Sequence, residues 1–413
     1  MRVILLTQYF PPETGAPQNR LLALAKSLQA NGAEVSVLTA MPNYPDMHVH
    51  EAYRGKWKVK ERVEGLAVIR AWLFVSTRRG SLHRLLNYFS FVLASLVVGL
   101  FNLRRSDVLF VESPPLFLGI TAMLLAKAKR AKLVFNVSDL WPESAVQLGL
   151  VKNRTVIAAS TWLEERCYRK AALITGQTQG IVSSIRSRFP EKRVVWIPNG
   201  VDFPAMAESE GSDPQLSRSK FGALPQDLVL AYAGIIGHAQ GLDVVLNAAA
   251  ALRDHPGILF LLIGDGPEKG RLQKLAAELN LRNLRFVDRM PRKELLGLLR
   301  GVDAMLIPLR RNDLFKGAIP SKIFEALALA KPILLGVEGE AKELFIDDGG
   351  GGVAFVPEDP DDLARKVLVY HADRSLLAEH GALGKAYAQQ HFDRAVIDQR
   401  LYMELRILVS GSR

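Results

Sequence analysis

The sequence predicts an α/β protein made of two doubly wound domains, each built on a parallel sheet. The first observation is length, because 413 residues exceed what one hydrophobic core usually holds. The second is that short apolar segments alternate with helical segments, as they do in parallel sheets. The third is that this rhythm breaks off in a polar stretch at residues 208–219 and then starts again.

In the first half, the predicted strands are short apolar runs of the kind that a parallel sheet buries on both faces. Helices are predicted between them, for example at residues 18–31 and 154–170. Ligands of such sheets bind at the carboxyl ends of the strands, so the loops that follow the strands are the candidate sites. The predicted strands cover residues 3–7, 34–39, 66–71, 108–111, 132–136, 173–175 and 194–197.

The second half repeats the pattern after a turn near residue 200. We therefore expect one domain at residues 1–203 and another at residues 204–390. The predicted strands cover residues 228–233, 258–264, 284–287, 304–308, 332–335 and 353–356, and the predicted helices cover 241–253, 268–279, 292–299 and a segment that begins at Pro320.

Charge is spread unevenly along the chain. Residues 1–205 hold 27 Lys and Arg against 14 Asp and Glu, a net charge of +13, whereas the remainder has a net charge of −2. A basic first half suggests an anionic partner such as nucleic acid, anionic lipid or a pyrophosphate. No nucleic-acid-binding motif is present, which disfavours the first of these. The single cysteine, Cys167, excludes an intramolecular disulfide and a cysteine-built metal site. The N-terminus suits a buried strand rather than a signal peptide, so we expect a cytoplasmic protein.

Residues 317–335 are the most informative segment of the chain. Pro320 and Ser321 suit the start of a helix, whose free N–H groups bind phosphate, and Lys322 adds a positive charge. Glu325 follows one turn later, where its carboxylate can accept two sugar hydroxyls. A diphosphate at the helix end and a ribose on Glu325 together describe a nucleotide. The alternative is an ordinary amphipathic helix with a chance Pro-Ser-Lys start.

This segment resembles the donor-binding helix of the family 4 retaining glycosyltransferases, whose GT-B fold is two Rossmann-like domains that face a central cleft. The Pro-Ser-Lys start is similar to the bacterial subgroup typified by the L-fucosamine transferase WbuB. The family carries two glutamates eight residues apart. Glu325 matches the second, whereas Gly317 stands where the first would be. The resemblance also implies that residues 391–413 form a helix that crosses back to the first domain.

The remaining donor-site candidates lie in loops of the second half. The resemblance places the loop with Gly264, Asp265 and Gly266 near the base and ribose, and makes Arg289 and Met290 candidates for reading the base. The alternative is that these glycines only form the tight turn that connects the strand to the following helix.

The loop that contains Gly237, Gln240 and Gly241 is not a dinucleotide-binding fingerprint. The family usually has Arg and Lys in this loop to neutralise the diphosphate, and Gln240 replaces that lysine here. The positive charge must then come from elsewhere. Lys322 is the first candidate, followed by Arg310, Arg311 and Lys316 in the loop before the helix, although Arg310 and Arg311 also suit a solvated surface.

Three loops of the first half hold further candidates, two for the acceptor side and one, with Gly15, for donor binding. In Asp-x-Trp-Pro-Glu-Ser, a hallmark of the subgroup, Asp139 suits a helix N-cap, and the resemblance places it at the sugar that is transferred. Trp141 either lines the sugar site or only packs against other side chains. Gly15, within Thr14-Gly15-Ala16, would approach the sugar and phosphate. Asn43 and Tyr44 belong to a Pro-Asn-Tyr-Pro turn that contacts the acceptor or is only structural.

Residues 85–103 form an uncharged stretch that is nearly long enough to span a bilayer. Three interpretations stay open: a helix with one membrane-facing side, a core helix, and a transmembrane span. Basic residues on both sides suit a surface that docks on anionic lipid. They are Arg78, Arg79, Arg84, Arg104 and Arg105.

Taken together, the resemblance implies a retaining glycosyltransferase that uses a UDP-sugar, with an N-acetylamino sugar as the group transferred. The acceptor would be an undecaprenyl-diphosphate-linked saccharide of a surface polysaccharide, at the inner face of the cytoplasmic membrane. No metal and no nucleic acid would be required. Two alternatives remain: a GT-B sugar-nucleotide 2-epimerase, and a non-catalytic protein that binds a nucleotide sugar or lipid.

Overall fold

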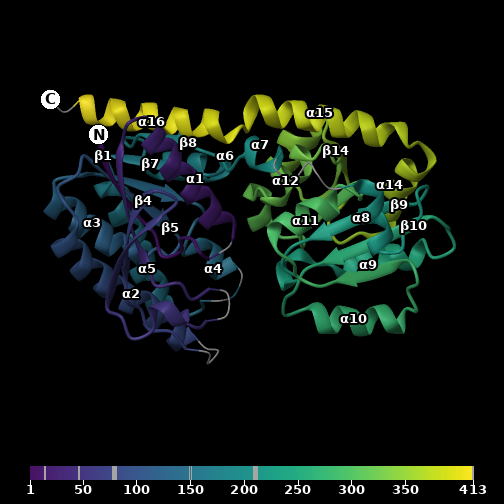
Figure 1. Ribbon diagram of the computed structural model, residues 1–413, viewed down its shortest axis with the longest axis horizontal. Coiled ribbons are helices and arrows are strands. Elements are labelled where there is room, and N and C mark those ends of the chain that lie inside the picture. Colours follow the sequence, from purple (N-terminus) through teal and green to yellow (C-terminus); the bar gives the residue numbers. More distant parts are fainter. Residues whose placement is uncertain are drawn as a thin grey trace. The chain divides into compact units, whose positions relative to one another are not determined.

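The computed structural model describes residues 1–13, 15–44, 47–76, 81–147, 149, 151–207 and 213–411. The chain divides into two compact units (Figure 1). The first unit combines residues 1–198 with residues 395–413, and the second consists of residues 199–394. The first unit is therefore discontinuous in sequence, and the second is inserted into it.

An eight-stranded sheet forms the centre of the first unit, in the order β3-β4-β2-β1-β5-β6-β7-β8. All neighbouring strands are parallel except β3, which pairs antiparallel with β4 at the edge. The strand order reverses between β1 and β5, the point where doubly wound sheets bind ligands. The strands are β1 (Arg2–Leu6), β2 (Glu34–Ala40), β3 (Lys58–Val63), β4 (Leu66–Ala71), β5 (Val108–Ser113), β6 (Lys132–Val137), β7 (Leu173–Gly176) and β8 (Val194–Trp196).

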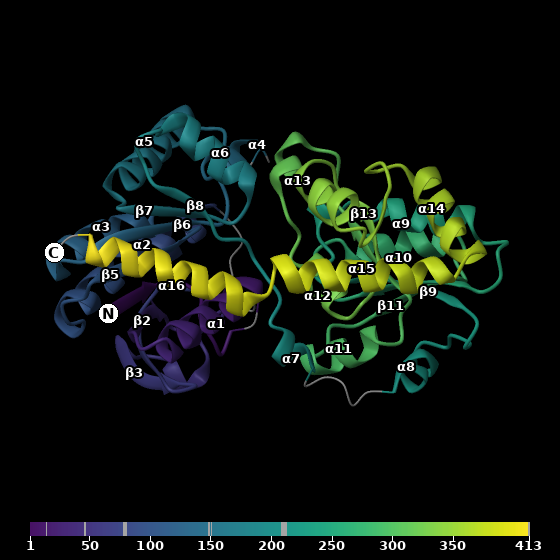
Figure 2. The ribbon, with the colours of Figure 1, turned by 90° about the horizontal axis from the view of Figure 1, so that it is seen from above.

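Helices cover both faces of this sheet, and each layer has its own apolar core. On one face, α1 and α16 pack on the strands, with Leu401 and Leu405 of α16 among the buried residues (Figure 2). On the other face lie α2, α3 and α5, and the buried Cys167 belongs to this core. The helices are α1 (Ala16–Ala30), α2 (Ser81–Asn102), α3 (Leu118–Lys129), α4 (Glu143–Gln147), α5 (Arg154–Lys170), α6 (Gln179–Arg188) and α16 (Arg394–Ser410).

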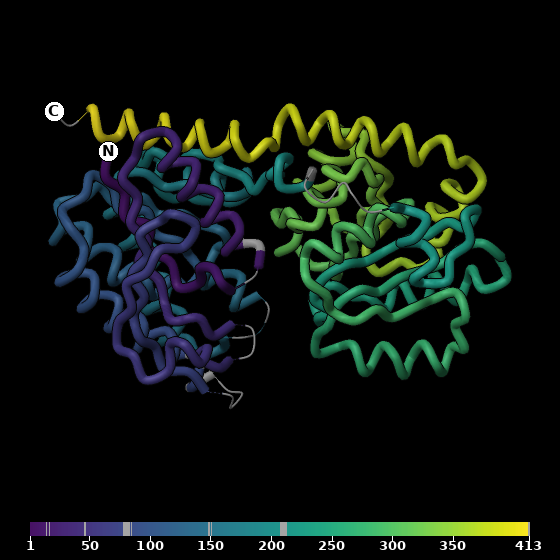
Figure 3. Tube along the Cα trace, viewed as in Figure 1, coloured from purple at the N-terminus to yellow at the C-terminus, as the bar shows by residue number. Residues whose placement is uncertain are grey.

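The second unit has a six-stranded parallel sheet in the order β11-β10-β9-β12-β13-β14. This order also reverses once, between β9 and β12. The path of the chain through the unit can be followed in Figure 3. The strands are β9 (Leu228–Ala233), β10 (Ile258–Ile263), β11 (Leu284–Val287), β12 (Ala304–Pro308), β13 (Ile333–Gly336) and β14 (Gly352–Ala354).

Helices α9, α10 and α14 contribute to the main core of the second unit. Helix α12 packs against β12, β13 and α15. The helices are α7 (Phe203–Ala207), α8 (Pro214–Lys220), α9 (Asp243–Ala251), α10 (Lys269–Glu278), α11 (Arg292–Leu299), α12 (Lys322–Ala328), α13 (Glu340–Lys342), α14 (Pro360–Ala372) and α15 (Ser375–His391), with the short helical turns η2 (His238–Gln240) and η3 (Asp313–Gly317).

The structure departs from the expected organisation in three places. The unit boundary lies after Pro198 rather than after residue 203, and the return to the first unit begins at Ala395 rather than residue 391. Strand β3 was not predicted, because its sequence Lys-Val-Lys-Glu-Arg-Val is mostly charged and only its edge position lets those side chains reach water.

Candidate functional site

The candidate residues fall at the carboxyl edges of the two sheets, in the loops that follow the strands. In the second unit they follow β9, β10, β11 and β12, and in the first unit they follow β1, β2 and β6. Both groups include the loop after the strand where the sheet order reverses. We name each group by the role that the resemblance implies for it: the donor half-site is the group in the second unit, and the acceptor half-site is the group in the first unit.

Glycines let the loops of the donor half-site pack directly on one another. Gly234 has φ 144°, and a Cβ on Gly264 would lie 1.9 Å from the Gly234 carbonyl oxygen. A Cβ on Gly266 would lie 2.3 Å from the Ile236 oxygen. The Ile236 N–H donates to the Asp265 oxygen at 2.9 Å, which fastens the two loops together. These glycines are therefore required for close contact between the two loops, and not only for the turns that connect strand to helix.

Lys322 lies against this glycine layer. A Cβ on Gly234 would fall 2.3 Å from its Cε atom, and its Nζ lies 5.0 Å from the centroid of the Tyr232 ring. Burial lowers the pKa of Lys322, and the nearby Glu325 carboxylate opposes that shift. Within the described ranges, no residue forms a hydrogen bond or ion pair with this ammonium group. It is a cation at the switch point of the sheet that has an aromatic neighbour but no anionic contact.

The start of α12 differs from the expected geometry. The helix begins at Lys322 and has seven residues, so Pro320 precedes it by two positions instead of opening it. Ser321 occupies the N-cap position with helical backbone angles, and its side chain makes no capping hydrogen bond. The Ile323 N–H donates to the Pro320 oxygen at 3.1 Å, which turns the chain into the helix. Ser321 is therefore at the start of the helix, as expected, without a capping bond from its side chain.

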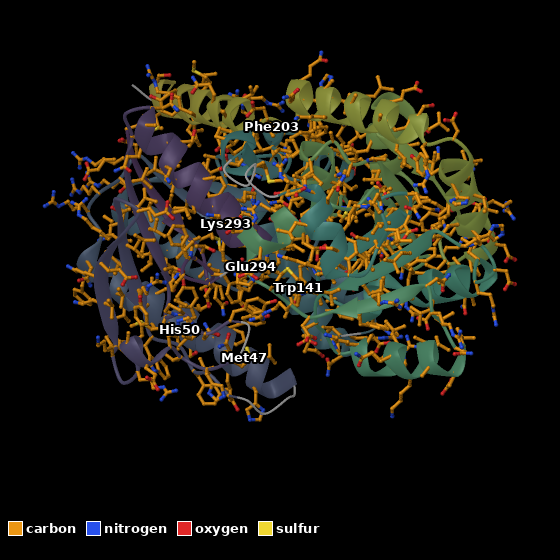
Figure 4. The ribbon with its side chains drawn as sticks, turned by 45° about the vertical axis from the view of Figure 1, so that its right-hand side comes forward. Met47, His50, Trp141, Phe203, Lys293 and Glu294 are labelled. Carbon is orange, nitrogen blue, oxygen red and sulfur yellow. The ribbon has the colours of Figure 1, made fainter. Side chains whose placement is uncertain are left out.

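Glu325 has a partner that the sequence did not reveal. The Arg292 Nη2 donates to Glu325 Oε1 at 3.1 Å, and both side chains are partly exposed. Arg292 is the first residue of α11, and the next two residues, Lys293 and Glu294, are labelled in Figure 4. Arg292 thus belongs to the donor half-site and holds the carboxylate that was predicted to bind ribose.

Two of the other cationic candidates of this half-site, Arg310 and Lys316, are engaged by protein groups. Arg310 Nε donates to the His238 oxygen at 2.7 Å, its guanidinium lies 3.7 Å from Glu358, and its Cγ would lie 3.0 Å from a Cβ on Gly241. Lys316 is paired with Asp313 at 2.7 Å. These contacts give Arg310 a structural role in the loop after β9.

The remaining predicted donor residues surround the same loops. A Cβ on Gly237 would lie 2.8 Å from Gln240 Oε1, and Asp265 Oδ1 accepts a hydrogen bond of 2.8 Å from the Gly266 N–H. Arg289 is exposed and Met290 partly exposed directly after β11. The structure therefore gathers Gly237, Gln240, Gly241, Gly264, Asp265 and Gly266 around the ends of β9 and β10, with Arg289 and Met290 following β11.

Asp139 anchors the acceptor half-site. It follows β6, and the Ser144 hydroxyl donates to its Oδ2 at 2.8 Å. Burial raises the pKa of Asp139, whereas hydrogen bonds from Ser144 and from the Leu140 backbone lower it by less. The Trp141 ring, labelled in Figure 4, meets Phe117 edge to face at 5.4 Å between centroids. Packing therefore accounts for at least part of the role of Trp141.

A buried carboxylate that the sequence did not indicate organises the neighbouring loop. Glu13 accepts hydrogen bonds from the backbone N–H groups of Asn43 at 2.7 Å and Tyr44 at 2.8 Å. Burial raises the pKa of Glu13 despite these bonds. Gly15 precedes α1 with extended backbone angles, whereas Thr14 and Pro45 lie outside the described residues. Asn43 and Tyr44 are thus held by Glu13.

Helix α2 carries the uncharged stretch noted in the sequence. By length and composition it is the one described helix that could cross a membrane, over Leu85–Asn102, and 39% of that window is buried. Its exposed apolar side chains recur every three or four residues, which gives one continuous stripe. The stripe consists of Leu86, Phe89, Leu93, Val97, Leu100 and Phe101. Arg78 and Arg79 lie outside the described residues, as does the side chain of Arg84.

Comparison with known proteins accounts for almost the whole chain. Residues 15–200 match the glycosyl transferase 4-like domain, and residues 214–386 match the glycosyl transferases group 1. The putative colanic acid biosynthesis glycosyl transferase WcaI of Escherichia coli K12 is 27% identical over 414 residues, covering 98% of this chain and all of that protein.

Solved structures show the same architecture. Anabaena HepE, in complex with UDP and glucose, superposes with a TM-score of 0.71 at 18% identity, over 98% of this chain and 99% of that one. WaaG, a glycosyltransferase involved in lipopolysaccharide biosynthesis, gives a TM-score of 0.68 at 18% identity, over 97% and 99% of the two chains. At such identities the likeness establishes the fold, and the predicted GT-B fold is confirmed.

Proposed function

Because this chain is a glycosyltransferase, in which a glycosyl transferase 4-like domain precedes a group 1 domain, we propose that it moves a sugar from a UDP-sugar to a lipid-linked saccharide, with retention of the donor's anomeric configuration. The process served would be the synthesis of a surface polysaccharide. The name of WcaI and the UDP complex of HepE support this assignment. The observation that carries it is the ammonium of Lys322, which lies beside the glycine loops at the end of β9 and has no hydrogen-bond or ion-pair partner among the described residues.

Lys322 supplies electrostatic stabilisation in this proposal. As the bond between the anomeric carbon and the β-phosphate oxygen breaks, negative charge grows on the departing UDP. The ammonium group of Lys322 neutralises that charge, and its low-dielectric surroundings strengthen the interaction. This assignment leaves no step that requires a metal ion. Glu325, held by Arg292, binds the ribose hydroxyls.

Asp139 acts on the acceptor. A carboxylate whose pKa is raised by burial is a better proton acceptor than an ordinary aspartate, so it suits a group that steers or deprotonates the attacking hydroxyl. The acceptor oxygen forms the new glycosidic bond, and its proton leaves with Asp139 or the departing phosphate. The finer assignment of an N-acetylamino sugar donor and an undecaprenyl-diphosphate-linked acceptor rests on the WbuB-like Pro-Ser-Lys and Asp-x-Trp-Pro-Glu-Ser motifs.

Membrane contact belongs to the same proposal. The exposed stripe of α2 is apolar, whereas exposed cations lie near its C-terminal end at Lys58, Arg104 and Arg105. Lys58 donates to Asn102 Oδ1 at 3.0 Å, which places that cation beside the end of the helix. An apolar stripe next to cations suits the surface of an anionic bilayer, where the stripe would enter the interface. A lipid-linked acceptor would be reached from that surface on the cytoplasmic side.

Calorimetric titration with UDP, GDP and ADP, with and without Mg²⁺, tests the donor assignment. We expect selective binding of UDP that does not depend on Mg²⁺ and that weakens in Glu325→Ala. Asp139→Ala should retain UDP binding and lose sugar transfer from UDP-sugars. A preference for GDP would overturn the donor assignment, and full transfer activity in Asp139→Ala would overturn the acceptor assignment.

A further inference from the structure

A buried polar network lies beneath the acceptor half-site. Arg20 of α1 donates to Glu112 Oε1 of β5 at 2.6 Å, and their side chains are only 8% and 5% exposed. The Ser138 hydroxyl donates to the same carboxylate oxygen. The second oxygen, Oε2, accepts from Asn136 Nδ2 of β6 at 2.8 Å, and Asn136 Oδ1 accepts from the Thr175 hydroxyl of β7 at 2.7 Å. The network around this carboxylate thus joins a helix to three neighbouring strands, the last of them through Asn136.

Stability alone is a weak reason for such a network. Removing a carboxylate and a guanidinium from water is costly, and apolar side chains of similar volume often replace a buried ion pair without loss. A fully hydrogen-bonded network instead fixes the geometry of the groups it joins. The network lies at the carboxyl ends of β5, β6 and β7, where the acceptor loops begin.

The network also reaches the residue that immediately precedes Asp139. Ser138 is fixed through its hydroxyl to Glu112 and through its backbone N–H to the Ser113 oxygen at 2.8 Å. On its other side, Asp139 is held by the Ser144 hydroxyl at 2.8 Å. The Asp139 carboxylate is therefore fixed from both directions along the chain.

We propose that Glu112, with Arg20 and Ser138, is a positioning unit that sets the place of the Asp139 carboxylate toward the acceptor hydroxyl. The inference rests on the proposed function, because it assumes that Asp139 works at the reacting centre. Glu112 and Arg20 touch no substrate in this scheme and act through Ser138. A displacement of about 1 Å at a catalytic group can cost roughly 100-fold in rate.

Two substitutions of different severity test the proposal. Glu112→Gln keeps the shape and removes the charge, and should lower kcat about 100-fold. Ser138→Ala removes one hydroxyl and should lower kcat at least about tenfold. In both variants we expect UDP affinity, measured calorimetrically, to stay within about twofold of wild type, because the donor half-site lies in the other unit.

Matched controls separate positioning from loss of folding. Glu164→Gln breaks another ion pair of the first unit, in which Arg188 Nη2 contacts Oε2 of the buried Glu164 at 2.6 Å. Ser217→Ala removes a buried hydroxyl that hydrogen bonds to the Gly297 oxygen at 3.0 Å. Both controls should retain kcat, even where their melting temperatures fall as far as those of the test variants.

Combining Glu112→Gln with Asp139→Asn distinguishes the positioning role of Glu112 from the catalytic role of Asp139. The proposal predicts no further loss of kcat in the double variant, because the network acts only through Asp139. The proposal would be overturned if Glu112→Gln lowered kcat by the same factor in the wild type and in Asp139→Asn. Unchanged kcat in Ser138→Ala and Glu112→Gln would overturn it as well. If Asp139→Asn alone keeps full turnover, the proposed function is what fails, whatever Glu112 does.

Discussion

At the scale of single residues, Lys322 shows a conflict between stability and function. Its ammonium is removed from water without an anionic contact in the described part of the chain, so its charge is costly to hold in the folded protein. In the proposed function this site receives two phosphate groups, and it would gain from that arrangement because the ligand supplies the missing partner.

Replacing Lys322 by Met should separate the two effects. The change keeps most of the apolar stem over Tyr232 and removes the charge, so we expect kcat to fall by about 10²–10³-fold while the free energy of unfolding stays equal or rises. Steady-state kinetics and urea unfolding measure the two quantities. Lys331→Met is the matched control, because burial also lowers the pKa of Lys331 but its Nζ donates to the Arg300 oxygen. Loss of turnover in the control as well would contradict the assignment.

The same residue predicts a pH dependence with a definite sign. Burial lowers the pKa of Lys322 in the folded protein below its value of 10.5 in the unfolded chain. At a pH between the folded-state pKa and the unfolded-state pKa, the unfolded chain therefore binds more protons. For this group the free energy of unfolding therefore rises with pH across that window, and Lys322→Met should remove the rise. UDP affinity should change in the opposite direction, because only the charged form attracts the diphosphate.

Sequence reasoning selected site candidates that belong to a local motif, and their catalytic roles stay predictions. Lys322 and Glu325 lie in one helical turn, and Asp139 lies in a distinctive run at the end of a strand. It missed Arg292 and Glu13, because their partners are distant in sequence: 33 residues separate Arg292 from Glu325, and 30 separate Glu13 from Asn43. Only the packing of the sheet brings such pairs together, so no local pattern identifies them.

At the scale of elements, prediction was most accurate where the apolar pattern is strongest. Strands β4, β9, β11 and β12 have the predicted bounds, because polar residues on both sides of a buried apolar run fix where the strand begins and ends. Strand β3 was missed because an exposed edge tolerates charge. Helix α2 combines both situations, with one face in the core and one face in solvent, and its sequence alone could not assign a function to the exposed face.

The exposed stripe of α2 leads to a test with vesicles. Leu93 is 64% exposed and Phe101 is 84% exposed, so Leu93→Asp combined with Phe101→Asp should leave the fold intact. If both side chains enter a bilayer, their loss should weaken partitioning to phosphatidylglycerol vesicles by at least about 100-fold. Co-sedimentation measures this, and binding should also weaken with salt.

The control for this test is Leu216→Asp, because Leu216 is similarly exposed at 61% but belongs to α8 of the second unit. Vesicle binding by this control should equal that of the wild type. Undiminished binding by the α2 variant would exclude the stripe as the membrane contact.

At the scale of the whole molecule, two units with separate cores should respond separately to heat and ligand. We expect scanning calorimetry to resolve two transitions, of which UDP raises only the one that belongs to residues 199–394. At 100 times its dissociation constant, a ligand adds about 2.7 kcal/mol to the unit that binds it.

A core substitution in α16 identifies the other transition. Leu401 is buried against the first sheet, so Leu401→Ala should remove about 2–5 kcal/mol from that unit only. Ile407→Ala on the same helix is the control, because Ile407 is exposed and its truncation should have little effect. A single transition that UDP and Leu401→Ala both shift would show that the units unfold together.

The insertion of the second unit within the first also has a consequence for synthesis on the ribosome. The first sheet is complete by Trp196, yet α16, which shares an apolar core with Val3, Leu5 and Phe110, begins only at Arg394. At a synthesis rate of about 5–20 residues per second, α16 is made roughly 10–40 s after the last strand of the sheet, and part of the apolar face stays exposed during that time. The second unit can fold as soon as it emerges from the ribosome. The nascent first unit should therefore be the part that chaperones bind.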